Sequence, residues 1–293
     1  MINVKYVLKR DGRREPFDRR KIEYTCIKLG VPDDVARRVS LLVERRAYDG
    51  ISTRELLDIV FEELAKVEPI FLEIVDLRSA LGRLRSKPDF EVYARILLRS
   101  IGFKTKPNLM IKGKCLEYEV DGLAYSNGEV YIVEAKHHSN PHTYTKLEDV
   151  MAIFSKYMDI VEGFREGIHT INPAGVIIVC NTKFTEHAIR FAECKGIKLM
   201  AWRYPKSRGI EDIIRKGHLY PVSILKNLDN EEMYKLLDSG IILLMDLTKI
   251  DPSMSIGIPR CRIIQLKRKA KKVLDYLSSS PEISLRRSPE LSL

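Results

Sequence analysis

The sequence lacks the features that mark secreted, disulfide-bonded and membrane proteins. Its 293 residues include only five cysteines, an odd number with no CxxC pair, which argues against a disulfide framework and a zinc ribbon. The longest apolar runs, at Gly175–Cys180 and Gly240–Met245, fall far short of the ~20 residues that a membrane span requires. The first residues contain no apolar signal-peptide core. We therefore expect a cytoplasmic protein with no membrane partner.

Glutamine is also scarce, and the two signs of charge are unbalanced. Gln265 is the only glutamine beside 50 lysines and arginines and 40 acidic residues, a composition typical of heat-adapted proteins. The formal net charge of +10 favours an anionic partner, and more than half of the excess lies in residues 258–293. The length of the chain predicts two domains, or three.

Residues 1–87 are expected to form a compact module of a small hairpin followed by helices. The capping box of Ser52 and Glu55 is the clearest helix start in this segment. The expected elements are an extended stretch at 4–8, a turn at Asp11-Gly12, a second short strand, and helices over 33–47, from Ser52 and from about Phe71 to Arg85. The proline at 88 ends the last helix.

Residues 88–206 change to an alternation of helices and strands, which predicts an α/β fold with a mixed sheet flanked by helices. The clearest turn signal is Asn127-Gly128, which predicts a hairpin. The other expected elements are helices near 90–101, 144–165 and 185–195 and strands near 176–180 and 197–202. Residues 207–277 are expected to be helical, and 278–293 to be a disordered tail.

Two neighbouring strands carry acidic side chains. In Glu129–Lys136 the two-residue period of a strand places Glu134 and Lys136 on one face at the strand's end. The strand expected at 114–125 pairs with it through the hairpin turn. Its acidic residues, which share a face, are Glu117, Glu119 and Asp121. Asp121 is the nearest of them to the turn, so we expect it beside Glu134.

Carboxylates that converge on a partly buried face repel each other and lose solvation, which is costly without a cation. A divalent cation, Mg²⁺ or Mn²⁺, is the usual resolution. Asp121, Glu134 and the main-chain carbonyl of Ala135 would bind it, and Lys136 would stabilise negative charge as water attacks a phosphodiester. The simpler alternative is that Glu134 and Lys136 form a solvated strand end.

The pattern of Asp121, Glu134 and Lys136 resembles the PD-(D/E)xK nuclease superfamily. The similarity covers residues 88–204 and is closest to the Mrr-like, archaeal junction-resolvase-like branch of the restriction-endonuclease fold. Val120 stands where the family has a proline before the aspartate. The resemblance implies a Mg²⁺-dependent endodeoxyribonuclease, whose partner is DNA.

The same resemblance implies a catalytic glutamate on the first helix, and Phe90-Glu91 matches that position. Without the family, an ion pair between Glu91 and Arg95 one turn later explains Glu91 equally well. In the family, the helix after the Glu-x-Lys motif follows the DNA backbone, a role that suits Tyr144, Lys146 and Lys156 and competes with a plain solvated helix face. His137, next to the motif, is a candidate assisting residue.

Residues 7–22 form a basic hairpin that is able to hold an anion, with Lys9, Arg10 and Lys21 available for phosphates. Their spacing resembles the ATP-cone, a nucleotide-sensing module, over residues 3–87. An alternative is a cone that folds but binds nothing. The resemblance implies that ATP or dATP would contact Val7, Lys9, Arg10, Glu15, Asp18, Lys21, Ile22 and Thr53.

The helical segment 207–277 contains a helix-Gly-Ile turn at Gly240 and a basic helix at 267–272, both compatible with DNA contact and with plain packing or a solvated surface. The hypothesis from the sequence is a DNA endonuclease that is regulated by nucleotide and can form a homodimer. One alternative is a non-catalytic, nucleotide-responsive DNA-binding regulator. Another is a pure nucleotide sensor that acts through protein contacts.

Overall fold

A computed structural model describes residues 6–9 and 12–279 of the chain. The chain divides into two compact units. The first contains the described parts of Met1–Val75, Leu225–Asn227 and Pro259–Leu293, and the second contains Asp76–Ile224 and Leu228–Ile258. These units do not coincide with the four expected segments 1–87, 88–206, 207–277 and 278–293, which stay a prediction. Residues 280–293 of the expected tail lie outside the described residues.

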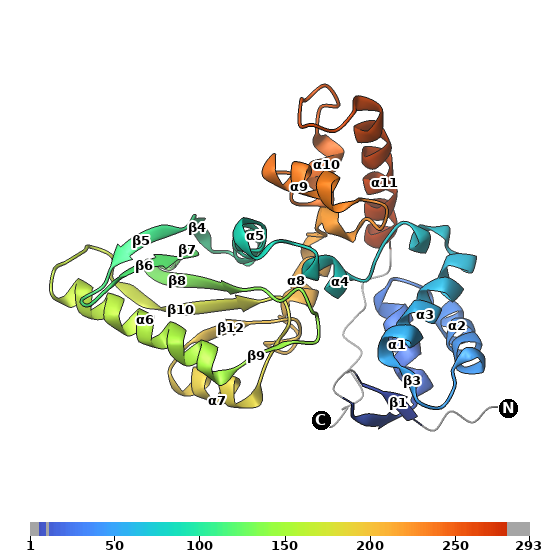
Figure 1. The fold of residues 1–293 in the computed structure, drawn as a ribbon, viewed down its shortest axis with the longest axis horizontal. Helices are drawn as coiled ribbons and strands as arrows, with labels where there is room; N and C mark the ends of the chain where they lie inside the picture. Colours follow the sequence, from blue (N-terminus) through green and yellow to red (C-terminus); the bar gives the residue numbers. More distant parts are fainter. Residues whose placement is uncertain (1–5, 10–11, 280–293) are drawn as a thin grey trace. The chain divides into compact units, whose positions relative to one another are not determined.

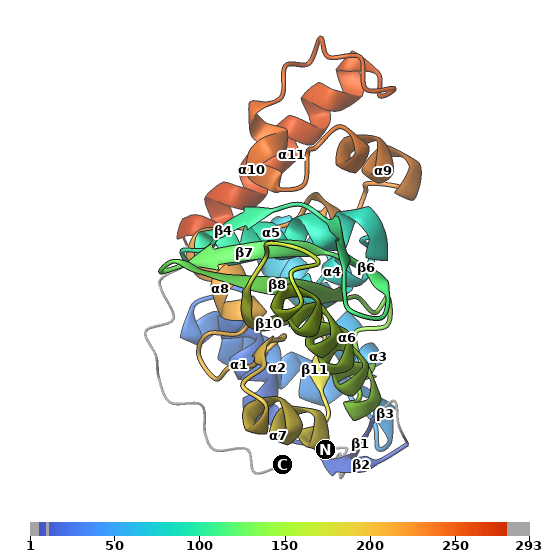
Figure 2. The ribbon, with the colours of Figure 1, turned by 90° about the vertical axis from the view of Figure 1, so that its left-hand side faces the viewer.

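The first unit has a small three-stranded sheet beside a group of helices (Figure 2). Strand β1 pairs antiparallel with β2 and parallel with β3. The elements are β1 (Tyr6–Leu8), β2 (Arg14–Pro16), α1 (Arg19–Lys28), α2 (Asp33–Arg46), β3 (Ile51–Ser52), α3 (Thr53–Val67), η1 (Pro69–Leu72) and α11 (Arg260–Ser279). As the capping box predicts, the Ser52 side chain accepts a hydrogen bond from the Glu55 amide at 3.1 Å.

The single helix expected from Phe71 to Arg85 is wrong, because the chain is interrupted there. The 3₁₀ turn η1 ends at Leu72, and a separate helix, α4 (Leu77–Gly82), begins after Asp76. The Asp76 carboxylate accepts hydrogen bonds from the amides of Arg78 and Ser79 at 3.1 and 3.0 Å. An aspartate in this position caps a new helix start and so favours two short helices over one.

The second unit is built on a five-stranded mixed sheet in the order β12-β10-β8-β7-β4. Strands β8, β10 and β12 are parallel to one another, whereas β7 is antiparallel to both of its neighbours. The strands are β4 (Lys104–Lys106), β7 (Gly122–Ser126), β8 (Glu129–Lys136), β10 (Pro173–Cys180) and β12 (Lys198–Met200). This sheet confirms the α/β class that the alternating pattern predicts.

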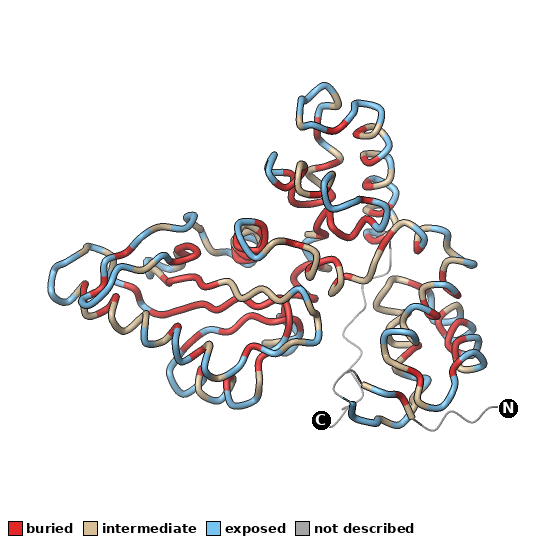
Figure 3. The backbone as a smooth tube through the Cα atoms, viewed as in Figure 1, coloured by how far each residue is buried: buried red, intermediate tan, exposed pale blue. Residues whose placement is uncertain are grey.

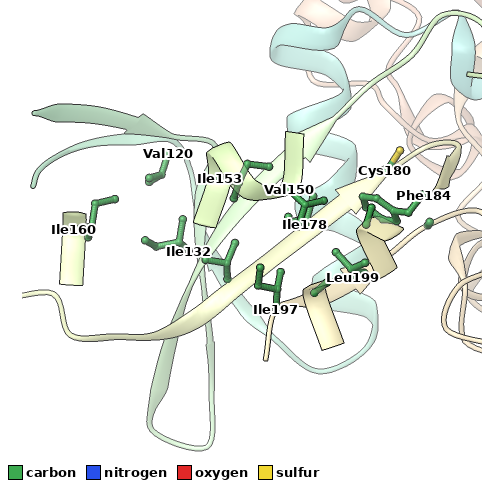
Figure 4. Close-up of a cluster of buried hydrophobic side chains, with 14 of the residues drawn as sticks. Val120, Ile132, Val150, Ile153, Ile160, Ile178, Cys180, Phe184, Ile197 and Leu199 are labelled. Carbon is green, nitrogen blue, oxygen red and sulfur yellow. The ribbon is translucent and has the colours of Figure 1, made fainter. Parts of the chain in front are cut away.

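Helices cover both faces of this sheet (Figure 1). Helices α6 (Leu147–Arg165) and α7 (Glu186–Cys194) lie on one face, and α5 (Glu91–Ser100) lies on the other. The core between the sheet and α6 and α7 is aliphatic, and Figure 4 shows Ile132 and Ile178 of the sheet within it. Long buried stretches of β8 and β10 are visible in Figure 3. Helices on the two faces therefore bury the central strands of the sheet.

The expected hairpin is present, but the strand expected at 114–125 is not continuous. Asn127 and Gly128 have φ angles of 51° and 80°, as a two-residue hairpin turn with both central residues in the left-handed region requires. The chain bends at Asp121, between β6 (Glu117–Val120) and β7. Strand β6 pairs with β5 (Leu109–Lys112) in a separate two-stranded sheet. The bend frees Asp121 from regular strand pairing.

The remaining elements of the second unit are short. They are η2 (Ser86–Phe90), β9 (Tyr144–Thr145), β11 (Lys183–Phe184), α8 (Ile210–Gly217), η3 (Val222–Ile224), α9 (Asn230–Asp238) and α10 (Leu244–Lys249). Strands β9 and β11 pair in parallel. Among the helices of residues 6–9 and 12–279, none is long and apolar enough to cross a membrane.

The turn that precedes α5 is fixed by a buried carboxylate. Asp89 is 1% exposed and accepts hydrogen bonds from Arg85 N at 3.0 Å and from its Nε and Nη2 atoms at 2.8 Å. The same guanidinium also bonds Asp238, whose side chain is 58% exposed. These two carboxylates share one arginine but differ in burial.

Replacing Asp89 by Ala is expected to lower the free energy of unfolding by about 3 kcal/mol, because it leaves the Arg85 guanidinium without its buried partner. Asp238→Ala is the matched control and should cost less than about 1 kcal/mol, since exposed ion pairs contribute little. Urea denaturation of the full chain measures both values. Equal losses for the two variants would show that burial does not decide the strength of this contact.

Candidate active site

Three acidic side chains lie close together in the second unit, beside β8, the central strand of the large sheet. Glu91 is the first residue of α5, Asp121 occupies the bend before β7, and Glu134 lies in β8. They are 5%, 7% and 7% exposed, respectively. Gly122 is paired with Val133, and so the hairpin register places Asp121 next to Glu134, as the sequence predicts.

The orientation of Asp121 is set by two hydrogen bonds. Its Oδ2 atom accepts from the main-chain amide of Ala135 at 2.8 Å. Its own carbonyl oxygen accepts from Arg95 Nη1, also at 2.8 Å. The alternative ion pair between Glu91 and Arg95 is absent from the described part of the chain. Arg95 instead holds the backbone of the bend, and Glu91 is left facing Asp121.

A lysine ammonium lies among the carboxylates. Lys87 Nζ is 3.2 Å from Glu91 Oε1, 3.2 Å from Glu119 Oε2 and 3.5 Å from Asp121 Oδ1. These neighbours raise the pKa of Lys87 against the opposing effect of burial. Lys87 is not among the site residues expected from the sequence, although its spacing of four from Glu91 is a signal for an ion pair.

A second lysine lies against the third carboxylate. Lys156 Nζ, from α6, is 2.5 Å from Glu134 Oε1 and also bonds the main-chain oxygen of Glu119. From the sequence, Lys156 is expected on a helix that faces DNA. In the structure its ammonium contacts Glu134. The acidic cluster therefore draws positive charge from two elements outside β8.

Burial and mutual repulsion make the negative charges of this cluster costly. The pKa of Glu91 is raised, first by burial and then by the charge of Asp121. The pKa of Glu134 is also raised by burial, although Lys156 opposes this effect. Both shifts mean that additional positive charge would stabilise the ionised carboxylates.

Lys136 differs from the other two lysines of the site. It is half-buried at the end of β8 and shares a strand face with Glu134. Within residues 6–9 and 12–279, no carboxylate forms an ion pair with it. Its contact with a phosphate stays a prediction.

The donor set fits a hard divalent cation. All three buried side chains supply carboxylate oxygens, the ligands that Mg²⁺ prefers. Glu91 Oε1 is buried and receives no hydrogen bond, despite the nearby Lys87 ammonium. Among the described residues, no group of three or more His, Cys, Asp and Glu side chains is already close enough together to hold a metal ion. The carbonyl of Ala135 as a ligand stays a prediction.

The loop that follows Lys136 is anchored by its histidines. His137 Nε2 lies 3.0 Å from the carbonyl oxygen of Leu81, and burial lowers the pKa of this histidine. The His138 amide donates to Asn181 Oδ1 at 2.8 Å. These contacts anchor the loop, and the assistance of His137 to chemistry stays a prediction. Tyr144 and Lys146, the other candidate DNA contacts, lie in β9 and at the start of α6.

The predicted nucleotide residues of the first unit gather around β1 and the starts of α1 and α3. Lys9 and Lys21 both pair with Glu15, and the Lys9 contact is 2.5 Å. Hydrogen bonds from Lys21 and Lys9 lower the pKa of Glu15 to about 2. Asp18 caps α1. The other members are Thr53, whose hydroxyl donates to Leu8 O at 3.3 Å, and Val7 and Ile22, which are buried; Arg10 lies outside the described residues.

The C-terminal basic helix is α11, in the first unit. Lys269, within the expected basic stretch 267–272, pairs with Glu73 at 2.6 Å. The predicted helix-Gly-Ile turn follows α9, and Gly240 has a φ of 78°. DNA contact by either feature stays a prediction.

Comparison with known proteins finds three family models that match successive regions of the chain. The ATP cone domain model matches residues 5–101, the Mrr restriction endonuclease model matches 84–203, and the AF1548-like C-terminal model matches 220–274. The first two matches confirm the resemblances drawn from the sequence.

The relatives are consistent with these matches. An uncharacterised protein of Archaeoglobus fulgidus is 34% identical over 181 residues, covering 61% of this chain and 98% of the relative. The crystal structure of AF1548, a protein of unknown function, has 31% identity and a TM-score of 0.55 and covers 68% of this chain and 98% of that one. The restriction endonuclease AspBHI, which is dependent on DNA modification, has 13% identity and a TM-score of 0.30 over 55% of this chain and 38% of its own.

Because the TM-score of AspBHI is only 0.30, the relationship depends on the family models and on the archaeal relative. This chain covers 98% of the length of that relative. The chain therefore belongs to the AF1548-like family and combines an ATP-cone domain with an Mrr-type restriction-endonuclease domain.

Proposed function

We propose that the second unit is an endonuclease that hydrolyses phosphodiester bonds in DNA with Mg²⁺ or Mn²⁺. The observation that carries the proposal is the convergence of three buried carboxylates beside Lys136, the lysine of the site that no described carboxylate neutralises. A structural ion-pair network would be expected to pair every lysine within it. The Mrr family match supports the same reaction class.

Each side chain has a distinct part in this proposal. Glu91, Asp121 and Glu134 would hold the cation, which when bound polarises the phosphodiester and lowers the pKa of an attacking water. The Ala135 amide keeps the Asp121 carboxylate turned into the site. The Lys136 ammonium would donate to a non-bridging phosphate oxygen and stabilise the charge that develops there. The ammonium groups of Lys87 and Lys156 would move away from these carboxylates when the cation binds.

The test is cleavage of labelled linear, nicked, flapped and four-way-junction DNA with Mg²⁺ or Mn²⁺. We expect cleavage of at least one substrate by the wild-type chain and its loss in Lys136→Ala. The matched control is Lys104→Ala, because Lys104 is an exposed lysine of β4 in the same sheet and has no ion pair among the described residues. Cleavage that survives in Lys136→Ala would refute the assigned site.

We also propose that the cone binds ATP or dATP and thereby regulates the second unit. Lys9 and Lys21 are held side by side by Glu15, which places two ammonium groups where one polyphosphate can meet both. Lys21→Ala should weaken ATP binding at least about tenfold, the effect of losing one charge-assisted contact of about 1.5 kcal/mol. Titration calorimetry measures it, and wild-type affinity in the variant would contradict the proposal.

A second candidate function is a DNA-binding regulator that retains the nuclease fold as a scaffold. The observation in its favour is that Lys87 and Lys156 lie against the acidic cluster and neutralise part of its charge without a metal. Such a protein would bind DNA and nucleotide but cleave none of the four DNA substrates. The cleavage assay separates the two candidates directly.

A further inference from the structure

Two neighbouring strands of the large sheet end side by side, and Lys136 is the last residue of one of them. Lys136 ends β8 and Cys180 ends β10, and these two residues are partners in the parallel register. Beyond them the chains separate, one toward β9 and the other toward β11. The end of a strand opens easily unless further contacts hold it. The position of Lys136 therefore depends on what holds the chain that follows it.

Asn181, the residue after β10, holds this end of β8. Its main-chain amide donates to the Lys136 carbonyl oxygen at 3.4 Å. Its side chain makes two bonds to the main chain of His138. The Oδ1 atom accepts from the His138 amide at 2.8 Å, and Nδ2 donates to the His138 carbonyl oxygen at 2.8 Å. The side-chain amide thus replaces a peptide group of the neighbouring strand and extends the contact two residues past Lys136.

The amide of an asparagine is well suited to this contact. Asn181 is 1% exposed, so its polar atoms need partners within the protein. An amide carries an acceptor and a donor on one planar group, which matches the N–H and C=O of a single residue. An ionised aspartate offers only acceptors, and alanine offers neither.

The segment that carries Lys136 is also fixed on its other side. The amide of Ala135, one residue earlier, donates to Asp121 Oδ2 at 2.8 Å. Lys136 therefore lies between a bond to the acidic cluster and the bonds to Asn181. A shift of its main chain would break one set or the other. The same short segment links Asn181 to the Asp121 carboxylate and to the base of the Lys136 side chain.

We propose that Asn181 is a positioning residue for the nuclease reaction, because it holds the main chain from Lys136 to His138. The inference rests on the proposed nuclease function, since the position of Lys136 matters only if its ammonium contacts the phosphodiester. Asn181 itself contacts neither the DNA nor the cation in this proposal. Its loss would let the Lys136 ammonium and the Asp121 carboxylate drift apart, and a misplacement of about 1 Å can cost about 10²-fold in rate.

The test compares single-turnover cleavage with DNA affinity in EDTA. Asn181→Ala should lower the cleavage rate at saturating DNA and Mg²⁺ about 10- to 100-fold. Its DNA affinity should stay within about twofold of the wild-type value, because the substitution removes no charge. A residue that only stabilised the fold would lower the Tm and leave the cleavage rate of the folded chain unchanged.

Thr185→Ala is the matched control. Thr185 also follows β10, and its hydroxyl oxygen accepts a hydrogen bond from the Ala188 amide at 3.3 Å. Its replacement removes a contact between a side chain and the main chain at the start of α7 but leaves the end of β8 intact. The cleavage rate of this variant should stay within about twofold of wild type, although its Tm should fall.

Hydrogen exchange detects the contact without any cleavage. The His138 amide should exchange at least about tenfold faster in Asn181→Ala than in the wild-type chain, and Thr185→Ala should not change it. Asn181→Asp is a second variant in case the alanine variant does not fold, because it keeps the size of the side chain and the acceptor for the His138 amide. It loses the donor to the His138 carbonyl oxygen, so its cleavage rate should still fall at least about fivefold.

The outcomes separate this inference from the nuclease proposal. Slow cleavage with wild-type DNA affinity and faster exchange at His138 would support it. Wild-type cleavage rates in the Asn181 variants, in a chain whose cleavage requires Lys136, would overturn the inference and leave the nuclease standing. An equal loss of rate in Thr185→Ala would also overturn it, since lost stability would then explain both. A wild-type chain that cleaves none of the DNA substrates would reject the nuclease and the role of Asn181 together.

Discussion

Replacing Asp121 by Asn is expected to abolish DNA cleavage, with a fall in rate of at least about 10³-fold, while the chain stays folded. The amide oxygen of asparagine can still accept the hydrogen bond that Ala135 gives to Asp121 Oδ2 at 2.8 Å. The shape of the bend is therefore retained. What is lost is one of the negative charges that would hold the divalent cation and place the attacking water.

The same substitution should leave the thermal stability equal or higher. The charge of Asp121 is one cause of the raised pKa of Glu91, so its removal relieves a repulsion between two buried carboxylates. The measurement combines single-turnover cleavage with thermal unfolding and DNA affinity in EDTA. A variant that loses cleavage together with stability would show a structural role for Asp121. One that keeps cleavage would remove it from the site.

The sequence predicts most of the fold because its strongest local signals agree with tertiary packing. The Asn127-Gly128 turn is present as expected, and the apolar strand expected near 176–180 is part of the longer β10 (Pro173–Cys180). The interruption at Asp121 was missed, because alternation of side chains along 114–125 does not reveal where a backbone leaves one sheet for another. The sequence also does not reveal the break before α4. Apolar residues at helical spacing predict one continuous helix there, although Asp76 caps the start of a separate one.

The sequence indicates the acids of the candidate site and Lys136, but not the contacts that Lys87 and Lys156 make with those acids. Motif spacing along the chain indicates Asp121, Glu134 and Lys136, and the family resemblance adds Glu91. Lys156 reaches Glu134 from a helix 22 residues away in sequence, a contact that only the packing of α6 on the sheet can create.

Lys87→Ala is expected to destabilise the chain when divalent cations are absent and to make its stability depend strongly on Mg²⁺. Lys87 is the one described cation that contacts both Glu91 and Asp121, at 3.2 and 3.5 Å. Its removal leaves these two buried carboxylates facing each other with their charge less compensated. The expected loss is about 2 kcal/mol, below that of a fully buried pair because the Lys87 side chain is 56% exposed.

Thermal unfolding in EDTA and in Mg²⁺ measures this effect, with Lys104→Ala as the control. In EDTA the Tm of Lys87→Ala should fall by about 5 °C. Saturating Mg²⁺ should restore most of that loss and so shift the Tm more than in the wild-type chain, because a cation that binds only the folded state stabilises it by mass action. If Mg²⁺ shifts both proteins equally, Lys87 and the metal do not share a site. A larger shift in the variant would place the cation beside Glu91 and Asp121, the two proposed ligands that Lys87 contacts, by a measurement that requires no cleavage.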